Sequence, residues 1–189
     1  MYEILEPFKV PLYKTVLSLD TKQTKLYCKK IQKNDKGLKI SNRGGYHSNN
    51  LTGSHFPLNE LFKNIEYHSN IFSKKCNFKN KVNIISLWIN INSNNHSNEA
   101  HTHTNTKFSG VYYVNTPKDC GNIVFHNPAY DTMIYDWNEN YNEFNGYNSC
   151  MFDIPVQENI LYIFPGWLKH NVKPNLSKKE RISISFNCN

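Results

Sequence analysis

Histidine and arginine side chains at particular spacings are the residues of this chain that could do chemistry. His101 and His103 lie two positions apart, and residues two apart on a strand or an extended segment point to the same side. Both imidazoles can therefore reach one cation. His170 is a third candidate, because it follows a predicted strand through the turn Pro165-Gly-Trp-Leu-Lys. Two ligands from one strand and a distant third can form a facial metal site with open positions.

The His-x-His pair is a weak signal by itself. The chain has 8 histidines, so a pair at this spacing can arise by chance. The alternative is that His101 and His103 are polar surface residues beside Asn98 and Asn105.

A second group of polar residues lies on the C-terminal strand. Arg181, Ser183, Ser185 and Asn187 alternate with Ile182, Ile184 and Phe186, so the polar set shares one face. A guanidinium and a hydroxyl on an inner face suit a carboxylate ligand, with each charge-assisted hydrogen bond worth about 1.5–3 kcal/mol. The alternative is an Arg181 at the strand edge, paired with Glu180 or Glu158.

The elements that must position these side chains are mainly strands. After residue 80 the chain has short segments rich in β-branched and aromatic residues, separated by turn residues such as Pro117, Gly121 and Pro155. This pattern predicts a β-sandwich or jelly roll. The predicted strands are 84–91, 108–114, 122–126, 150–154, 160–164 and 181–187.

The first 80 residues are expected to support that core within a single domain, 1–189. Segment 8–17 alternates well enough for an early strand, with Pro11 indicating an edge position. Segment 29–50 is polar and basic, and is predicted to be a long surface segment. Pro57 opens a predicted helix whose apolar residues recur at i, i+3, i+4 and i+7: Leu58, Leu61, Phe62 and Ile65.

Composition indicates a folded globular protein with an excess of positive charge. The chain has 189 residues, is 39% hydrophobic and carries a net charge of +7. Much of the excess lies in Lys22, Lys25, Lys29, Lys30, Lys33, Lys36 and Lys39. Such a patch can attract nucleic acid, but a solvated basic face is the preferred interpretation, because no nucleic-acid-binding motif accompanies it.

The cysteines and the N-terminus indicate the compartment. The five cysteines form no C-x-x-C pair, which argues against a disulfide framework or structural zinc and for a reducing compartment. Neither a signal peptide nor a membrane-spanning segment is visible. We therefore expect a cytoplasmic protein.

Five segments, in order, resemble a family of small 2-oxoglutarate/Fe(II)-dependent oxygenases found in bacteria and their phages. They are Ser41-Asn-Arg-Gly-Gly-Tyr-His-Ser48, Trp88-Ile-Asn-Ile, His101-Thr-His followed by Ser109-Gly-Val-Tyr-Tyr-Val114, Phe164-Pro-Gly-Trp-Leu-Lys-His170, and Arg181-Ile-Ser-Ile-Ser-Phe-Asn187. The interval from His170 to Arg181 is similar to the spacing of the distal histidine and the 2-oxoglutarate arginine in the wider superfamily.

The resemblance implies a double-stranded β-helix with flanking helices, and Fe(II), 2-oxoglutarate and O2 as cofactor and cosubstrates. It implies His101, His103 and His170 as metal ligands, and Arg181 and Ser183 as the 2-oxoglutarate site. Tyr113 is expected to face inward and donate a hydrogen bond to the cosubstrate, with Tyr112 facing the opposite side. His103 departs from the acidic ligand of most superfamily members, so Asn105 or a water is an alternative third ligand.

The implied reaction is hydroxylation of a peptide or protein side chain or of a small metabolite, with decarboxylation of 2-oxoglutarate to succinate. Two alternatives stay open: a three-histidine cupin-like metalloenzyme that does not use 2-oxoglutarate, and a non-catalytic jelly-roll binding module. A nucleobase substrate is weakly supported, and a homodimer is possible. Segments 41–50 and 136–148 are the expected substrate contacts. Trp88, Phe164 and Trp167 are expected either to wall the site or to pack in the core.

Overall fold

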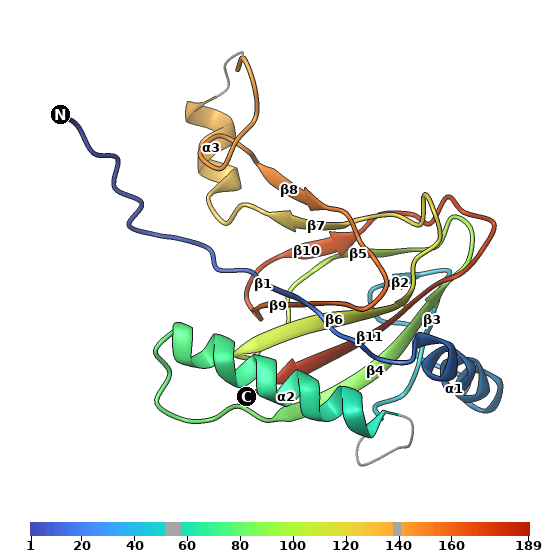
Figure 1. Ribbon diagram of the computed structural model, residues 1–189. Helices are drawn as coiled ribbons and strands as arrows, with labels where there is room; N and C mark the ends of the chain where they lie inside the picture. The colour runs from blue at the N-terminus through green and yellow to red at the C-terminus, as the bar shows by residue number, and fades with distance from the viewer. Residues whose placement is uncertain (52–57, 138–140) are drawn as a thin grey trace.

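The structure is a computed structural model that describes residues 1–51, 58–137 and 141–189. Two antiparallel sheets face each other (Figure 1). In spatial order, the six-stranded sheet contains β1 (Tyr13–Val16), β9 (Ile160–Pro165), β6 (Phe108–Asn115), β11 (Arg181–Cys188), β4 (Ile84–Asn92) and β3 (Tyr46–His47). The five-stranded sheet contains β2 (Asn42–Arg43), β5 (Ser97–His101), β10 (His170–Val172), β7 (Ile123–His126) and β8 (Met151–Ile154). The predicted mainly-β class is confirmed.

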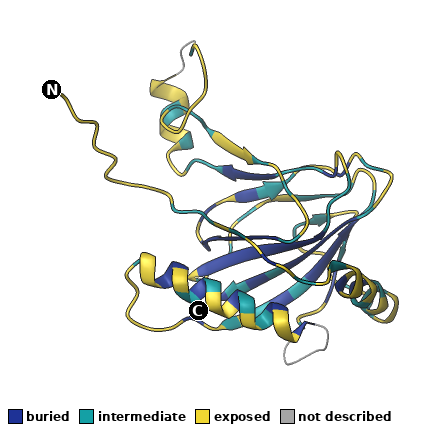
Figure 2. Cartoon of the chain, viewed as in Figure 1, coloured by how far each residue is buried: buried dark blue, intermediate teal, exposed yellow. Residues whose placement is uncertain are grey.

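Alternation along the central strands divides the core into two layers. Tyr112 and Ile184 belong to the cluster on the outer face of the larger sheet. Tyr113, one residue from Tyr112, belongs to the cluster that joins β6 and β9 to Phe125 of β7, between the sheets. Figure 2 shows this burial along the strands of the larger sheet. The chemistry-bearing residues of β11 therefore share the inner face, as the alternating pattern predicted.

Two helices cover the outer face of the larger sheet. Helix α2 (Asn59–Lys75) buries Leu61, Ile65 and Phe72 against it, and Leu58, directly before the helix, is also fully buried. The predicted apolar stripe is confirmed, with Phe62 partly buried at its side. Pro57 lies outside the described residues.

Helix α1 (Thr21–Asn34) corrects the prediction that segment 29–50 is a surface segment throughout. Asp20 caps it by accepting hydrogen bonds from the backbone N–H groups of Lys22 and Gln23, at 3.0 and 3.1 Å. Only Thr24 and Cys28 of the helix are buried. The exposed residues of the helix include Lys22, Lys25, Lys30 and Lys33, so most of the basic patch of the sequence lies on the solvent-facing side of α1.

The first part of the chain completes both sheets. β1 and β3 form the two edges of the larger sheet, and β2 forms one edge of the smaller. The edge position predicted for segment 8–17 is confirmed, although the strand covers only residues 13–16. Strands β5 and β10, and the short helix α3 (Tyr130–Asp136), were not predicted.

All five cysteines are free, as the absence of a disulfide pattern predicted. Within the described ranges, none of the helices is both long and apolar enough to cross a membrane.

Candidate metal centre and its cavities

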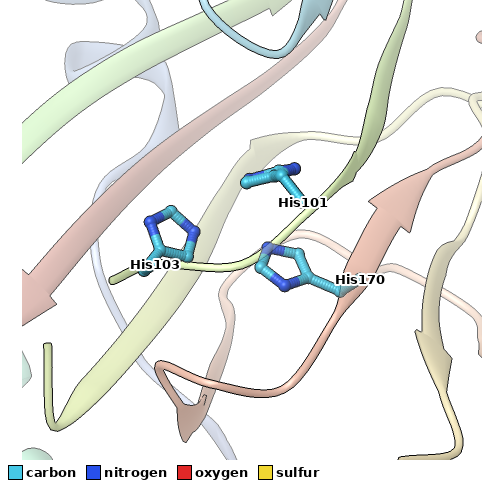
Figure 3. Close-up of side chains that lie close together, drawn as sticks. All are labelled: His101, His103 and His170. Carbon is cyan, nitrogen blue, oxygen red and sulfur yellow. The ribbon is translucent and has the colours of Figure 1, made fainter. Parts of the chain in front are cut away.

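Sheet pairing brings the three histidines together. His170 of β10 is the direct partner of His101 of β5, and their ring centroids lie 4.5 Å apart. Strand β5 ends at His101, and His103 follows in the connection to β6, with its ring 5.0 Å from His101 and 5.2 Å from His170. One potential ligand atom from each of the three lies within 4.8 Å of the others. Figure 3 shows the three rings around one space.

Backbone carbonyls orient two of these imidazoles. Nδ1 of His101 lies 2.7 Å from the Glu99 carbonyl oxygen, and Nδ1 of His170 lies 2.9 Å from that of Leu168. A carbonyl only accepts, so each Nδ1 carries the hydrogen and each Nε2 keeps a lone pair for a metal. His103 is placed through its backbone, because its N–H donates to the Gly166 carbonyl at 2.8 Å.

Burial keeps the cluster neutral. Burial first, and then repulsion from a charged His101, lower the pKa of His103 to about 4 and that of His170 to about 3. Burial also lowers the pKa of His101. Neutral imidazole is the metal-binding form, and three imidazoles suit Fe, Zn, Cu or Ni. The donor set therefore fits a divalent transition metal.

Asn105 is not part of this cluster. It is exposed, in a turn with a φ of 56°, and it lines neither of the two cavities described below. Glu99 is not part of the cluster either, and Arg43 binds its carboxylate.

A partly enclosed space beside the histidines, here called the inner cavity, is lined by the predicted cosubstrate residues. It has a volume of about 40 Å³ and is lined by residues that include the three histidines, Tyr113, Arg181 and Ser183. Tyr113 lines the cavity, whereas the hydroxyl of Tyr112 lies on the other face and bonds Asn159 Oδ1 at 2.5 Å.

Arg181 is 1% exposed, and half of its guanidinium is held by backbone. Nη1 donates to the Cys120 carbonyl and, at 2.9 Å, to the Lys173 carbonyl. Gly121 makes room for this arrangement: its φ is +84°, and a Cβ there would lie 2.8 Å from Nη1. Nη2 is buried and has no hydrogen-bond partner among the described residues.

The alternative of an edge arginine paired with an acid is wrong. Lys29 binds the Glu180 carboxylate at 2.9 Å. Within the described parts of the chain, neither Glu158 nor any other carboxylate pairs with Arg181. A buried guanidinium with one free nitrogen is costly unless an anion accepts from it.

Tyr113 presents a second unpaired donor. Its hydroxyl is fully buried and lacks a hydrogen-bond partner among the residues described. Burial raises its pKa, so the phenol stays protonated and able to donate. Arg181, Tyr113 and Ser183 line the same cavity, so a bound carboxylate would satisfy donors that otherwise lack acceptors.

Only two of the three aromatic residues that were expected to wall the site or to pack in the core line the inner cavity. Trp88 and Phe164 line the inner cavity, and Phe164 is also a buried core residue. Trp167 is 55% exposed and lines neither cavity, so it does not wall the site.

A second space, here called the outer cleft, opens on the other side of His101 and His103. Its volume is about 470 Å³, and it shares Ser41, Trp88, His101 and His103 with the inner cavity. Segment 41–50 contributes Ser41, His47 and Asn50. No described residue of 136–148 lines either space. His47 was not predicted as a site residue, although its segment carried part of the resemblance.

A family model described as "Putative 2OG-Fe(II) oxygenase" matches residues 86–187, more than half of the 189-residue chain. The chain belongs to the 2OG-Fe(II) oxygenase family. This oxygenase therefore uses Fe(II), 2-oxoglutarate and O2, and the three imidazoles and the unpaired donors above are consistent with that set. No curated protein sequence matches the chain significantly.

Solved structures of other proteins share the fold of this chain. A Pseudomonas putida prolyl-4-hydroxylase is 11% identical with a TM-score of 0.67, covering 94% of this chain and 92% of that one. The viral collagen prolyl hydroxylase of Paramecium Bursaria Chlorella virus-1, in its 2OG complex, is 14% identical with a TM-score of 0.61 and 94% coverage of both chains. HygX from Streptomyces hygroscopicus, with nickel, 2-oxoglutarate and hygromycin B bound, is 7% identical with a TM-score of 0.61, covering 95% and 82%.

Proposed function

We propose that His101, His103 and His170 hold the Fe(II) of this oxygenase, and that Arg181, Ser183 and Tyr113 bind 2-oxoglutarate. One observation carries the proposal: Arg181 and Tyr113 line the cavity that the three histidines border, and the buried Nη2 of Arg181 and the buried hydroxyl of Tyr113 lack partners among the described residues. The enzyme would hydroxylate a peptide or protein side chain or a small metabolite.

The metal and its cosubstrates supply the oxidising chemistry, in which 2-oxoglutarate is converted to succinate as the substrate is hydroxylated. The protein's own part is placement. Arg181 donates Nη2 to the distal carboxylate of 2-oxoglutarate while backbone carbonyls fix Nη1. Ser183 and Tyr113 add neutral donors, and this arrangement fixes the orientation of the cosubstrate relative to the histidines.

The inner cavity would exclude water from the site, and the outer cleft would give the substrate access to it. Phe164 and Val111 form apolar parts of the inner cavity wall, where low exposure strengthens each polar contact. The outer cleft opens beside His101 and His103, which makes it the approach for substrate. The peptide option agrees with the two prolyl hydroxylases among the solved structures, and the small-molecule option with HygX and hygromycin B.

Anaerobic Fe(II) and 2-oxoglutarate titrations test the assignment. We expect a weak visible charge-transfer band in the wild type, which disappears in His101→Ala and in His170→Ala. The same variants should lose uncoupled succinate production. His68→Ala is a matched control, because His68 lies on α2 beside Tyr13. Metal that binds without the band, or a band that survives both substitutions, would refute the proposed ligands.

A further inference from the structure

The outer cleft contains a fourth histidine that the proposed metal site does not use. His47 is 7% exposed and belongs to β3, where it pairs with Asn90 of β4. Its ring stacks on Trp88, with centroids 5.4 Å apart and planes inclined by 12°. Both residues line the cleft. A buried histidine held by a strand and by a stacked aromatic ring has one orientation.

The hydrogen bond of His47 decides which nitrogen faces a ligand. Nδ1 lies 2.8 Å from the Ser48 carbonyl oxygen, and a carbonyl cannot donate, so Nδ1 carries the hydrogen. Burial lowers the pKa of His47, so the ring is neutral and Nε2 is an acceptor. In the part of the chain that the structure describes, no hydrogen bond to Nε2 is formed.

Asn187 also lines the cleft. Its Oδ1 is buried and has no hydrogen-bond partner among the described residues.

The charge of the residues that line the cleft also limits what it can bind. Although the protein has a net charge of +7, neither lysine nor arginine is among the described residues that line the cleft. Its one carboxylate, on Glu99, is bound by Arg43. A cleft with unpaired hydrogen-bond acceptors and no cation favours neutral molecules that carry hydrogen-bond donors. It disfavours anions.

An apolar wall completes the recognition surface. Leu38 and Ile40 line the cleft and are 41% and 65% exposed, and Trp88 continues this wall toward His103, whose ring centroid lies 5.9 Å from that of Trp88. A molecule that lies along the wall meets apolar surface and acceptors together. A peptide has this combination, because uncharged side chains alternate with backbone N–H donors.

We propose that the outer cleft binds an uncharged peptide segment as the substrate, with a backbone N–H donating to His47 Nε2 and a side chain on Trp88. This inference rests on the proposed function, and it makes His47 a specificity-determining residue for that reaction. It also places the basic face of α1 outside substrate recognition, and so argues against a nucleic acid as the substrate.

Binding of blocked peptides to the anaerobic Fe(II)–2-oxoglutarate enzyme tests the proposal. The probes are Ac-Gly-X-Gly-NH2 peptides, with X aliphatic, aromatic or proline, followed by calorimetry and by the change in the visible band. Matched peptides carry Glu at X, and an oligothymidylate represents nucleic acid. We expect the uncharged peptides to bind and the anionic probes not to bind. Binding of only the anionic probes, or of none, would overturn the inference.

His47→Phe removes the acceptor and keeps a ring to stack on Trp88, whereas His47→Gln keeps a side-chain acceptor. We expect His47→Phe to weaken peptide binding roughly 2- to 10-fold, as for one neutral hydrogen bond, with an unchanged band without peptide. His47→Gln should recover part of the affinity. Equal affinity in His47→Phe and the wild type would reject the role of His47.

N-methylated peptides give the sharpest control. Methylation of the contacted amide removes the donor, so it should weaken binding to the wild type but make little difference to His47→Phe. An equal effect in both proteins would show that the hydrogen bond does not exist. Absence of the band in the wild type would refute the proposed metal and cosubstrate site, whereas a normal band without peptide binding would refute only the peptide-binding role of the outer cleft.

Discussion

His101 and His170 are direct partners across β5 and β10, and their ring centroids lie 4.5 Å apart. Each ring has Nδ1 fixed on a backbone carbonyl, so both present Nε2 to the same space. Sheet register and two hydrogen bonds thus prepare the pair before an ion arrives, and little rearrangement is needed to bind one.

Loss of His170 should abolish tight metal binding. His170→Ala leaves two imidazoles, one of them outside regular structure, and we expect Fe(II) affinity to fall by at least about 10- to 100-fold, the range found even for residues that only support ligands. Anaerobic calorimetry measures the affinity. An unchanged affinity would contradict the role of His170, and His68→Ala controls for loss of a histidine elsewhere.

Arg181→Lys keeps a positive charge but removes the guanidinium. In the wild type, Nη1 of that group donates to two backbone carbonyls while Nη2 stays free for a ligand. We expect the KM for 2-oxoglutarate to rise roughly 10- to 100-fold, equivalent to one charge-assisted hydrogen bond, while Fe(II) affinity changes little. Uncoupled succinate production at varied 2-oxoglutarate gives the KM. Arg43→Lys, an exposed arginine paired with Glu99, should leave this KM unchanged.

Tyr113→Phe should have opposite effects on binding and on stability. Without its buried and unpaired hydroxyl, the cosubstrate-free protein should be as stable as the wild type or more stable, by about 1 kcal/mol. The affinity for 2-oxoglutarate should fall roughly 2- to 10-fold. Urea unfolding and calorimetry measure the two quantities. A loss of stability without a loss of affinity would assign Tyr113 to packing alone.

Metal-free protein should lose stability as the pH falls through the range of free histidine. The folded-state pKa is about 4 for His103 and about 3 for His170, against about 6.5 in an unfolded chain. Between these values the unfolded state binds more protons, so the free energy of unfolding decreases from pH 6.5 toward pH 4. Urea unfolding at several pH values should show a shallower decrease in His103→Asn. Parallel curves would contradict the lowered pKa of His103.

Alternation along single strands was readable from the sequence. The pattern from Arg181 to Asn187 placed the guanidinium and Ser183 on one inner face, and the structure has them lining the inner cavity. The apolar recurrence of Leu58, Leu61 and Ile65 likewise predicted the buried face of α2. Both signals are local, because side-chain direction repeats every two residues on a strand and every 3.6 on a helix.

Other features depend on contacts that no local pattern records. β5 and β10 are short and polar, and they are strands because each pairs with neighbours. α1 was missed because its lysines obscure a narrow buried stripe at Thr24 and Cys28. Trp167 resembled a site residue in its motif, but it lies in a turn and faces solvent. The position of His47 depends on its stacking on Trp88. The two residues are far apart in the sequence, so no local pattern predicts this contact.

The bond from His103 N–H to the Gly166 carbonyl has a consequence for how the site tolerates change. Gly166 opens the connection that leads to His170, and a Cβ on Gly166 would collide with the backbone oxygen of Thr106 and approach that of His103. The two connections are therefore held in contact with each other. A length change in either would displace a pair of imidazoles together, so insertions that are harmless in other loops of the molecule would disable this centre in a single step.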